Sequence, residues 1–186
     1  GGMERAILVV GQPLLLARQE WGEAAPGVPA GPVALDELVA QCVGAAVPQA
    51  QARGIDLGVV QADSASTPGD ASALRILLGN LIDNAVKYAP QGGQVDVSLL
   101  AKYGDPLLVV EDNGPGIPED ERERAFDRFY RLADGNSTAE GSGLGLAIVR
   151  AIADKHGAQV VLDRSERLGG LRVTVRFGRR SEAPRA

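Results

Sequence analysis

Cysteine and histidine are nearly missing from this sequence, which has one residue of each, Cys42 and His156, among 186. A lone cysteine cannot form a disulfide bond within the chain, and no group of cysteine and histidine residues has the spacing of a metal site. Cys42 is therefore predicted to pack as a small apolar side chain rather than to react. The sequence points away from disulfide-rich folds and from zinc sites built on Cys and His.

Aromatic residues, basic charge and long apolar runs are also scarce. Phe, Trp and Tyr make up 4% of a sequence that is 45% hydrophobic, so we expect a core of leucine, valine, isoleucine and alanine. The net charge of -5 disfavours nucleic acid as a partner, because a surface that follows a phosphate backbone is normally basic. No apolar run reaches the ~18 residues expected of a membrane-spanning helix, and no signal peptide is visible.

The composition divides the chain into four parts. Residues 4–20 carry a crowded apolar series that fits a helix with a wide buried stripe, interrupted at Gly11 and Pro13. Residues 22–32 are rich in glycine, proline and alanine, which indicates a linker. We predict an N-terminal helical segment over residues 1–22 with a cloning scar at 1–2, a linker over 23–32, a globular domain over 33–178 and a flexible tail over 179–186.

Helix and strand patterns alternate through residues 33–178. Asp70 and Asp36 are each suited to the N-cap of a helix, and Gly157 is suited to a helix C-terminus. Helices are expected over residues 37–52, 71–88, 122–130 and 144–156. Strands are expected over residues 33–35, 55–60, 94–100, 107–111, 160–163 and 171–177. The pattern predicts a mixed α and β domain whose helices cover one sheet.

The stretch NLIDNAVKYA, residues 80–89, places an unusual polar stripe on the 71–88 helix. Asn80 and Asn84 are four residues apart and share a face that Lys87 extends, with the aromatic Tyr88 next to it. Amide oxygens suit Mg²⁺ that already holds phosphate oxygens and waters, and a lysine neutralises phosphate. A solvated helix face is the alternative, although asparagine has poor helix propensity. The stripe alone leaves both interpretations open.

The stretch EDNGPGIP, residues 111–118, places a carboxylate at the end of an apolar strand. If Asp112 is buried it needs a hydrogen-bond donor, and the exocyclic amine of adenine is one. Gly114 and Gly116 let the backbone turn tightly beneath a flat ring. An ordinary β-turn explains the same pattern equally well.

The stretch FDRFYR, residues 126–131, combines an apolar pair with a basic pair. Phe126 and Phe129 are three residues apart, which suits the anchoring of a loop to a core. Arg128 and Arg131 have the same spacing and point elsewhere, where phosphate contact and a solvated surface are comparable interpretations. The polar segment that follows lacks periodicity and is expected to be mobile.

The stretch EGSGLGL, residues 140–146, places three glycines directly before an apolar helix. Gly141, Gly143 and Gly145 would expose backbone N–H groups at the positive end of that helix, which is a phosphate cradle. A flexible hinge is the alternative interpretation. The stretch is not a P-loop, because no GK[ST] follows.

Taken in order, these motifs resemble the catalytic, ATP-binding domain of bacterial sensor histidine kinases. They correspond to that family's N, G1, F and G2 boxes, and the resemblance covers about residues 33–178. It implies an α+β fold, a two-layer α/β sandwich of the Bergerat type with a mixed sheet of about five strands under three helices. It also implies that residues 1–22 are the end of a dimerisation-domain helix.

The resemblance implies a site for ATP and Mg²⁺. Asn84, with Asn80 nearby, would hold the metal, and Lys87 and Arg131 would contact the phosphates. Asp112 would bind the adenine amine. The other nucleotide contacts that the resemblance implies are Tyr88, Gly114, Gly116, Ile117, Gly141, Ser142, Gly143, Leu144, Gly145 and Leu146.

The resemblance also implies partners. The domain would donate the γ-phosphate of ATP to a histidine on an upstream dimerisation domain, and the kinase would act on a response regulator. The whole protein would be a homodimer at the inner membrane with this domain in the cytoplasm, and no nucleic acid is expected. His156 matches a structural position of the family rather than the phosphoacceptor, and Leu171 stands where many relatives have a threonine near adenine.

Two alternative functions share the implied fold. ATPases of the gyrase and chaperone types carry a glutamate one helical turn before the metal-binding asparagine, where it activates water. Asn80 occupies that position here, and an amide cannot take a proton from water at neutral pH. The second alternative is a non-catalytic nucleotide-binding regulatory module, which the intact motifs disfavour.

Overall fold

The computed structural model describes residues 31–102, 104–128 and 145–178. The helix expected over residues 4–20, most of the linker, the segment expected to be mobile and the C-terminal tail lie outside these ranges. Pro32, which we expected to close the linker, opens the first strand, β1 (Pro32–Ala34).

Five strands in the described residues form one mixed sheet in the order β2-β4-β5-β7-β6. β2 runs parallel to β4, and every other neighbouring pair is antiparallel. The register between β2 and β4 shifts between Val59 and Gln61, which leaves Val60 as an irregularity in the strand. The strands are β2 (Asp56–Ala62), β4 (Gln94–Lys102), β5 (Asp105–Asp112), β6 (Gln159–Arg164) and β7 (Leu171–Arg176).

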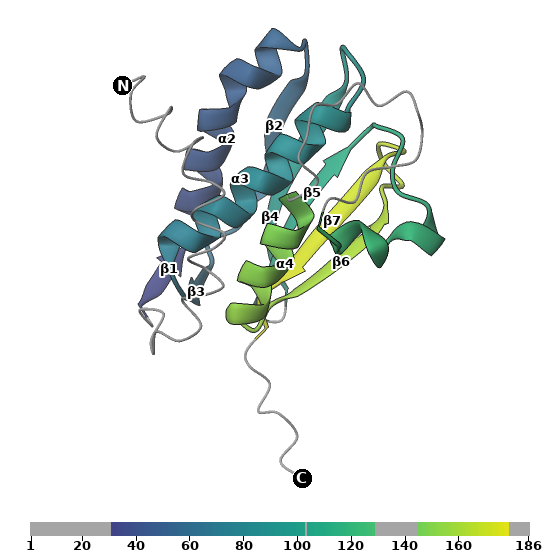
Figure 1. Cartoon of the computed structure of the whole chain (residues 1–186). Coiled ribbons are helices and arrows are strands. Elements are labelled where there is room, and N and C mark those ends of the chain that lie inside the picture. The colour runs from purple at the N-terminus through teal and green to yellow at the C-terminus, as the bar shows by residue number, and fades with distance from the viewer. Residues whose placement is uncertain (1–30, 103, 129–144, 179–186) are drawn as a thin grey trace.

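Three helices cover one face of this sheet, so the two-layer sandwich predicted from the sequence is confirmed (Figure 1). They are α2 (Leu35–Ala52), α3 (Ala71–Tyr88) and α4 (Gly145–Lys155). The core between the layers is built almost wholly from leucine, valine, isoleucine and alanine, as the scarcity of aromatics predicted. None of the described helices is long and apolar enough to cross a membrane.

Of the two aspartates predicted as helix N-caps, only Asp70 caps its helix. The side chain of Asp70 accepts hydrogen bonds from the backbone N–H groups of Ser72 (2.9 Å) and Ala73 (3.4 Å), so the predicted cap of α3 is confirmed. Asp36 is not a cap. α2 begins at Leu35, two residues before the predicted start at residue 37, with Ala34 as its N-cap residue, and Leu35 N donates to Ala65 O (2.9 Å).

Two further expectations need correction. The segment after β2, in which no strand was expected, contains strand β3 (Ser66–Pro68), which pairs antiparallel with β1. The helix expected over residues 122–130 is replaced by two 3₁₀ turns, η1 (Glu119–Glu121) and η2 (Arg124–Phe126). Asp127 then takes an extended conformation, which stops helical growth. Residues 129–130 lie outside the described ranges.

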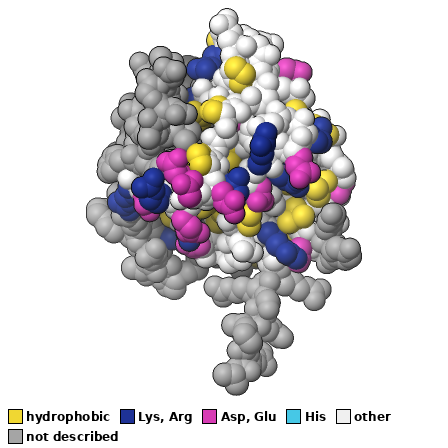
Figure 2. All heavy atoms as spheres, turned by 90° about the vertical axis from the view of Figure 1, so that its right-hand side faces the viewer, with side chains coloured by type: hydrophobic (Ala, Val, Ile, Leu, Met, Phe, Trp, Pro, Cys, Tyr) yellow, Lys and Arg dark blue, Asp and Glu magenta, His cyan; other side chains and the backbone are white. Residues whose placement is uncertain are grey.

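Cys42 is buried in α2, with Sγ 3.8 Å from Arg75 O. Burial raises the pKa of its thiol to about 11, so the thiol stays protonated at neutral pH. The predicted packing role is thus consistent with the structure. On the face of the molecule shown in Figure 2, acidic and basic side chains are interspersed rather than separated into patches.

Candidate functional site

The polar stripe on α3, formed by Asn80, Asn84 and Lys87, is buried or partly buried along its length. Asn80 is 9% exposed, and its Nδ2 donates to Ile76 O (2.8 Å), which leaves its Oδ1 free of the helix. Asn84 is partly buried, and its amide makes no hydrogen bond to any residue that the structure describes. Lys87 Nζ lies 3.0 Å from Asp83 Oδ2 at the partly exposed end of the helix. The stripe therefore presents two amide oxygens and one ammonium group that are available to a ligand or held only by a weak surface ion pair.

The start of α4 meets this stripe at Asn84. A Cβ atom built on Gly145 would lie 2.9 Å from Asn84 Oδ1 and 3.0 Å from Asn84 Nδ2, so only glycine leaves the amide undisturbed. Leu146, the next residue, is partly buried and packs against the core. The fold thus joins the asparagine motif to the last glycine of the glycine-rich motif. Arg131, Gly141, Ser142, Gly143 and Leu144 lie outside the described residues.

Asp112 ends β5 and is 3% exposed. It stands opposite the core residue Val95 in the β4–β5 register, so its side chain points to the helix side of the sheet. Its Oδ1 accepts hydrogen bonds from Gly114 N (2.8 Å) and Leu171 N (3.3 Å). Its Oδ2 accepts none from the described residues. Burial raises the pKa of Asp112, and the two backbone hydrogen bonds oppose that rise.

The loop after Asp112 passes over the end of α3. A Cβ atom on Gly114 would lie 2.6 Å from Tyr88 O, so this glycine permits a close backbone approach. Gly116 has φ 73°, a conformation that favours glycine. Ile117 is partly buried and packs against the core. The loop therefore links the predicted adenine motif to the end of the asparagine helix.

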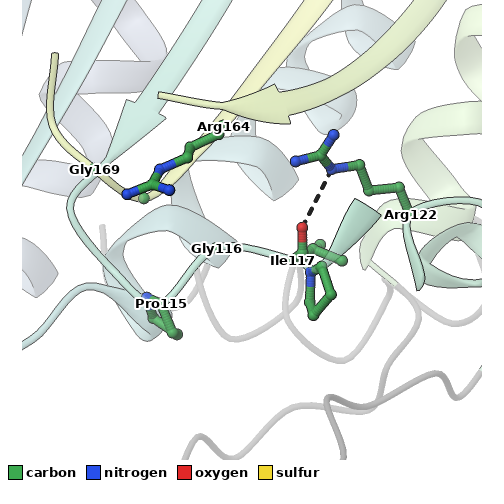
Figure 3. A pocket seen from close by; sticks show the side chains of 8 residues that line it. Pro115, Gly116, Ile117, Arg122, Arg164 and Gly169 are labelled. Carbon is green, nitrogen blue, oxygen red and sulfur yellow. Dashed lines mark hydrogen bonds between the residues drawn. The ribbon is translucent and has the colours of Figure 1, made fainter. Parts of the chain in front are cut away.

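A polar hollow of about 320 Å³ lies between this loop and the turn that joins β6 to β7 (Figure 3). Gly116 and Ile117 line it, whereas Asp112 and Asn84 do not. Arg122 Nε donates to Ile117 O (3.2 Å) and so braces the loop from this side. The complete lining is Pro115, Gly116, Ile117, Pro118, Arg122, Arg164, Gly169 and Gly170.

Leu171 contributes a contact that the sequence did not reveal. We noted it as the loss of a threonine hydroxyl, but its backbone N–H bonds to Asp112 across 59 positions of sequence. Backbone hydrogen bonds leave no trace in residue type, so no local signal identified this one. His156 lies away from the site, where its Nε2 accepts from Asp70 N (3.1 Å) and its Nδ1 lies 2.8 Å from Ile152 O.

The described residues fit a nucleotide and a magnesium ion. A buried carboxylate oxygen without a donor suits an exocyclic amine, and free amide oxygens beside a glycine suit a hard cation. Within the described ranges, no group of three or more His, Cys, Asp or Glu side chains is placed to hold a metal ion.

Comparison with known proteins gives a consistent result. Residues 69–181 match the family described as histidine kinase-, DNA gyrase B- and HSP90-like ATPases. Sensor protein QseC of Escherichia coli strain K12 is 38% identical over 175 residues, which cover 94% of this chain and 37% of QseC. Sensor protein kinase PmrB of Pseudomonas aeruginosa is 36% identical over 173 residues, which cover 93% of this chain and 35% of PmrB.

A solved structure shows the same arrangement in three dimensions. Mycobacterial sensor histidine kinase MprB aligns with a TM-score of 0.71 at 33% identity, over 78% of this chain and 96% of the MprB chain. The chain spans little more than a third of the length of the two curated relatives, 37% of QseC and 35% of PmrB.

Proposed function

Because the chain belongs to the family of histidine kinase-, DNA gyrase B- and HSP90-like ATPases, we propose that it is the ATP-binding catalytic module of a sensor histidine kinase. It binds Mg-ATP and donates the γ-phosphate to a histidine on another domain. Its own single histidine, His156, is bonded within the fold to Asp70 N and is not the acceptor.

The observation that carries this proposal is the buried carboxylate of Asp112. One oxygen is bonded twice by backbone N–H groups, and the other accepts nothing from the described residues although the side chain is 3% exposed. A buried acceptor without a donor costs about 1–3 kcal/mol, and the N6 amine of adenine supplies the missing donor. Tyr88 and Ile117, which border the same loop, then pack against the base.

The metal and phosphate contacts come from α3 and the start of α4. Asn84, with Asn80 one turn before it, holds Mg²⁺ through an amide oxygen, and Lys87 leaves Asp83 to contact phosphate. The glycines from Gly141 to Gly145, with Ser142, Leu144 and Leu146, let the chain approach the phosphates, and Arg131 neutralises their charge. Bound Mg-ATP supplies the phosphoryl group and the cation that offsets its charge.

Histidine kinase chemistry fits this site better than hydrolysis. A water-activating base is needed one turn before Asn84, and Asn80 stands there with its Nδ2 donating to Ile76 O. An amide held in this way has no proton affinity at neutral pH. The site therefore offers no group at this position that could activate water for attack on the γ-phosphate.

The proposal extends to the whole protein. The acceptor histidine lies on an upstream dimerisation domain, the phosphate passes to a response regulator, and the kinase is a homodimer. The domain faces the cytoplasm below an inner-membrane sensor. Similarity to QseC and PmrB over 94% and 93% of this chain supports these assignments.

Radiolabelled ATP tests the proposal directly. After incubation with γ-labelled Mg-ATP, the chain alone should stay unlabelled, whereas a longer product of the same gene that includes the upstream histidine should gain acid-labile label. The same longer product with Asn84→Asp should lose most of that label. Acid-labile label on His156 of the isolated chain, or an unlabelled long product, would contradict the proposal.

A further inference from the structure

The turn between β6 and β7 is built around Ser165, which has no exposed surface. Its backbone N donates to Gly170 O (2.7 Å), and its carbonyl accepts from Gly169 N (2.7 Å). Its Oγ accepts from Leu168 N (3.1 Å) and donates to Glu111 Oε1 (3.0 Å). The turn is therefore closed on itself and tied to the end of β5.

Arg167, at the tip of this turn, ties it to the sheet a second time. Its Nη2 lies 2.6 Å from Asp96 Oδ2 and 3.4 Å from Glu111 Oε2. The two carboxylates are 5% and 6% exposed and face each other across β4 and β5. We call these three residues the arginine bridge. Two buried carboxylates in adjacent strands repel each other unless a cation lies between them, so Arg167 holds the turn against the sheet.

The arginine bridge and the candidate nucleotide site lie on opposite faces of the sheet. Glu111 and Asp112 are consecutive in β5, and consecutive strand residues point to opposite faces. Asp112 points to the helix side, so Arg167 acts from the other side and cannot contact a nucleotide held there. Any effect of Arg167 on nucleotide binding must pass through the backbone.

A backbone connection of this kind is present. Gly170 N donates to Asp112 O (3.1 Å), and Leu171 N donates to Asp112 Oδ1 (3.3 Å). A Cβ atom on Gly170 would collide with Asp112 O and Oδ1, so the turn fits tightly under the aspartate. Two backbone N–H groups orient the carboxylate and so decide which oxygen is left without a donor: Gly114 N (2.8 Å) from within the loop and Leu171 N (3.3 Å) from the turn.

We propose that Arg167 is a positioning residue for base recognition, which holds the β6–β7 turn so that Leu171 N fixes Oδ1 of Asp112 and leaves Oδ2 for the base. This inference rests on the proposed function, because it takes Asp112 as the group that selects adenine. Loss of the bridge loosens the turn and weakens the Leu171 N bond, so that Gly114 N alone orients the carboxylate and holds it less firmly. Adenine then loses its fixed acceptor, and discrimination against guanine falls.

Competition of ATP and GTP against a fluorescent nucleotide tests the inference in Arg167→Gln, Arg167→Lys and Arg176→Gln. Arg176, on β7, is the matched control. Its side chain is 56% exposed, compared with 54% for Arg167, and it pairs with Asp105 at 3.6 Å. Arg167→Gln should weaken ATP binding about tenfold and narrow the ATP/GTP ratio by a similar factor, a loss comparable to one hydrogen bond. Arg167→Lys should recover part of both, and Arg176→Gln should change neither.

The selectivity ratio separates positioning from a purely structural role. If Arg167→Gln lowered the melting temperature but kept the ATP/GTP ratio of the parent, the inference would be overturned. Should Arg167→Gln fail to fold, Asp96→Asn makes the same test, because it weakens the bridge from the strand side by removing the charge that Arg167 Nη2 contacts at 2.6 Å and leaves the turn unchanged. Asp112→Asn is the reference variant. If it kept the ATP affinity and the ATP/GTP ratio of the parent, the base assignment of the proposed function would be wrong. If it lost ATP binding while Arg167→Gln kept the affinity and ratio of the parent, only the present inference would be overturned.

Discussion

In the proposed site, the carboxylate of Asp112 would serve base recognition at the expense of stability. A buried carboxylate with one unbonded oxygen opposes folding, and the same oxygen is what an adenine amine needs. We expect Asp112→Asn to weaken ATP binding roughly tenfold to a hundredfold and to narrow the ATP/GTP gap, because guanine then meets an amide donor. Competition binding measures both quantities. Unchanged ATP affinity with unchanged selectivity would mean that Asp112 does not recognise the base.

The stability of the unliganded Asp112→Asn variant should move in the opposite direction. Burial raises the pKa of Asp112 in the folded protein above its value in the unfolded chain. The parent therefore loses stability as the pH rises from the unfolded pKa through the folded pKa. Asparagine keeps an acceptor for Gly114 N and Leu171 N without the charge. The variant should therefore melt a few degrees higher than the parent at pH 7, and the difference should shrink as pH falls below the unfolded pKa. Thermal melts of both proteins across a range of pH measure this difference. If Asp112→Asn melted below the parent at pH 7, Asp112 would be a structural residue.

Gly145 and Asn84 should act as one unit in metal-dependent binding. A methyl group on Gly145 would force the Asn84 amide to move, since the new carbon would lie 2.9 Å from Oδ1. Gly145→Ala and Asn84→Asp should each reduce the part of ATP affinity that depends on Mg²⁺, as measured by calorimetry with and without the ion. Gly79→Ala, on the same α3 helix with open space around its Cβ, is the control. It should add up to ~1 kcal/mol of stability and leave binding unchanged.

At the scale of elements, His156 fastens the end of α4 to the start of α3. Its Nε2 accepts from Asp70 N, and its ring lies against Gly69, where any Cβ atom would collide with it. We expect His156→Ala to cost about 1 kcal/mol, seen as a melting temperature lowered by a few degrees. His156→Gln should recover part of that loss. Neither variant should change Mg-ATP affinity, and an affinity loss equal to that of Asn84→Asp would place His156 in the site.

Local patterns predicted the elements that local interactions build. The cap at Asp70 and the C-terminus of α4 at Gly157, with φ 64°, depend on residues within one helical turn. β3 has three residues and exists only because β1 pairs with it from more than thirty positions earlier. α2 follows β1 directly, and its first residue, Leu35, donates to Ala65 O beside β3, a contact that the sequence near Asp36 does not reveal.

The residues of the candidate site also fall into those that local sequence predicts and those that depend on distant partners. The sequence marked Asn84, Asp112 and Gly145 because their residue types are unusual for their elements. It did not mark Arg167, whose partners Asp96 and Glu111 lie 71 and 56 residues away, or the Leu171 backbone, whose partner lies 59 residues away. A surface arginine in a polar turn has nothing in its neighbourhood that distinguishes it, and only the strand register brings Asp96 and Glu111 together beneath it.

At the scale of the molecule, nucleotide binding should stabilise the whole domain, because the candidate contacts come from α3, β5 and α4 together. A ligand at a hundred times its dissociation constant adds about 2.7 kcal/mol, which corresponds to a rise of roughly 5–10 °C in melting temperature. Mg-ATP should produce this rise, and GTP at equal concentration should produce less. Equal shifts from both nucleotides would show that binding does not involve the base.

The irregularity at Val60 also affects how copies of the molecule meet. In the described residues β2 is an outer strand, with Val59 42% and Val60 55% exposed, so its free edge could add a strand from a second copy. The register shift between Val59 and Gln61 breaks the even spacing that such an addition requires. Deletion of Val60 should restore an unbroken edge and make light scattering rise with protein concentration, while scattering from the parent stays flat. One extra residue in an edge strand would then be what keeps separate copies of this domain from pairing edge to edge.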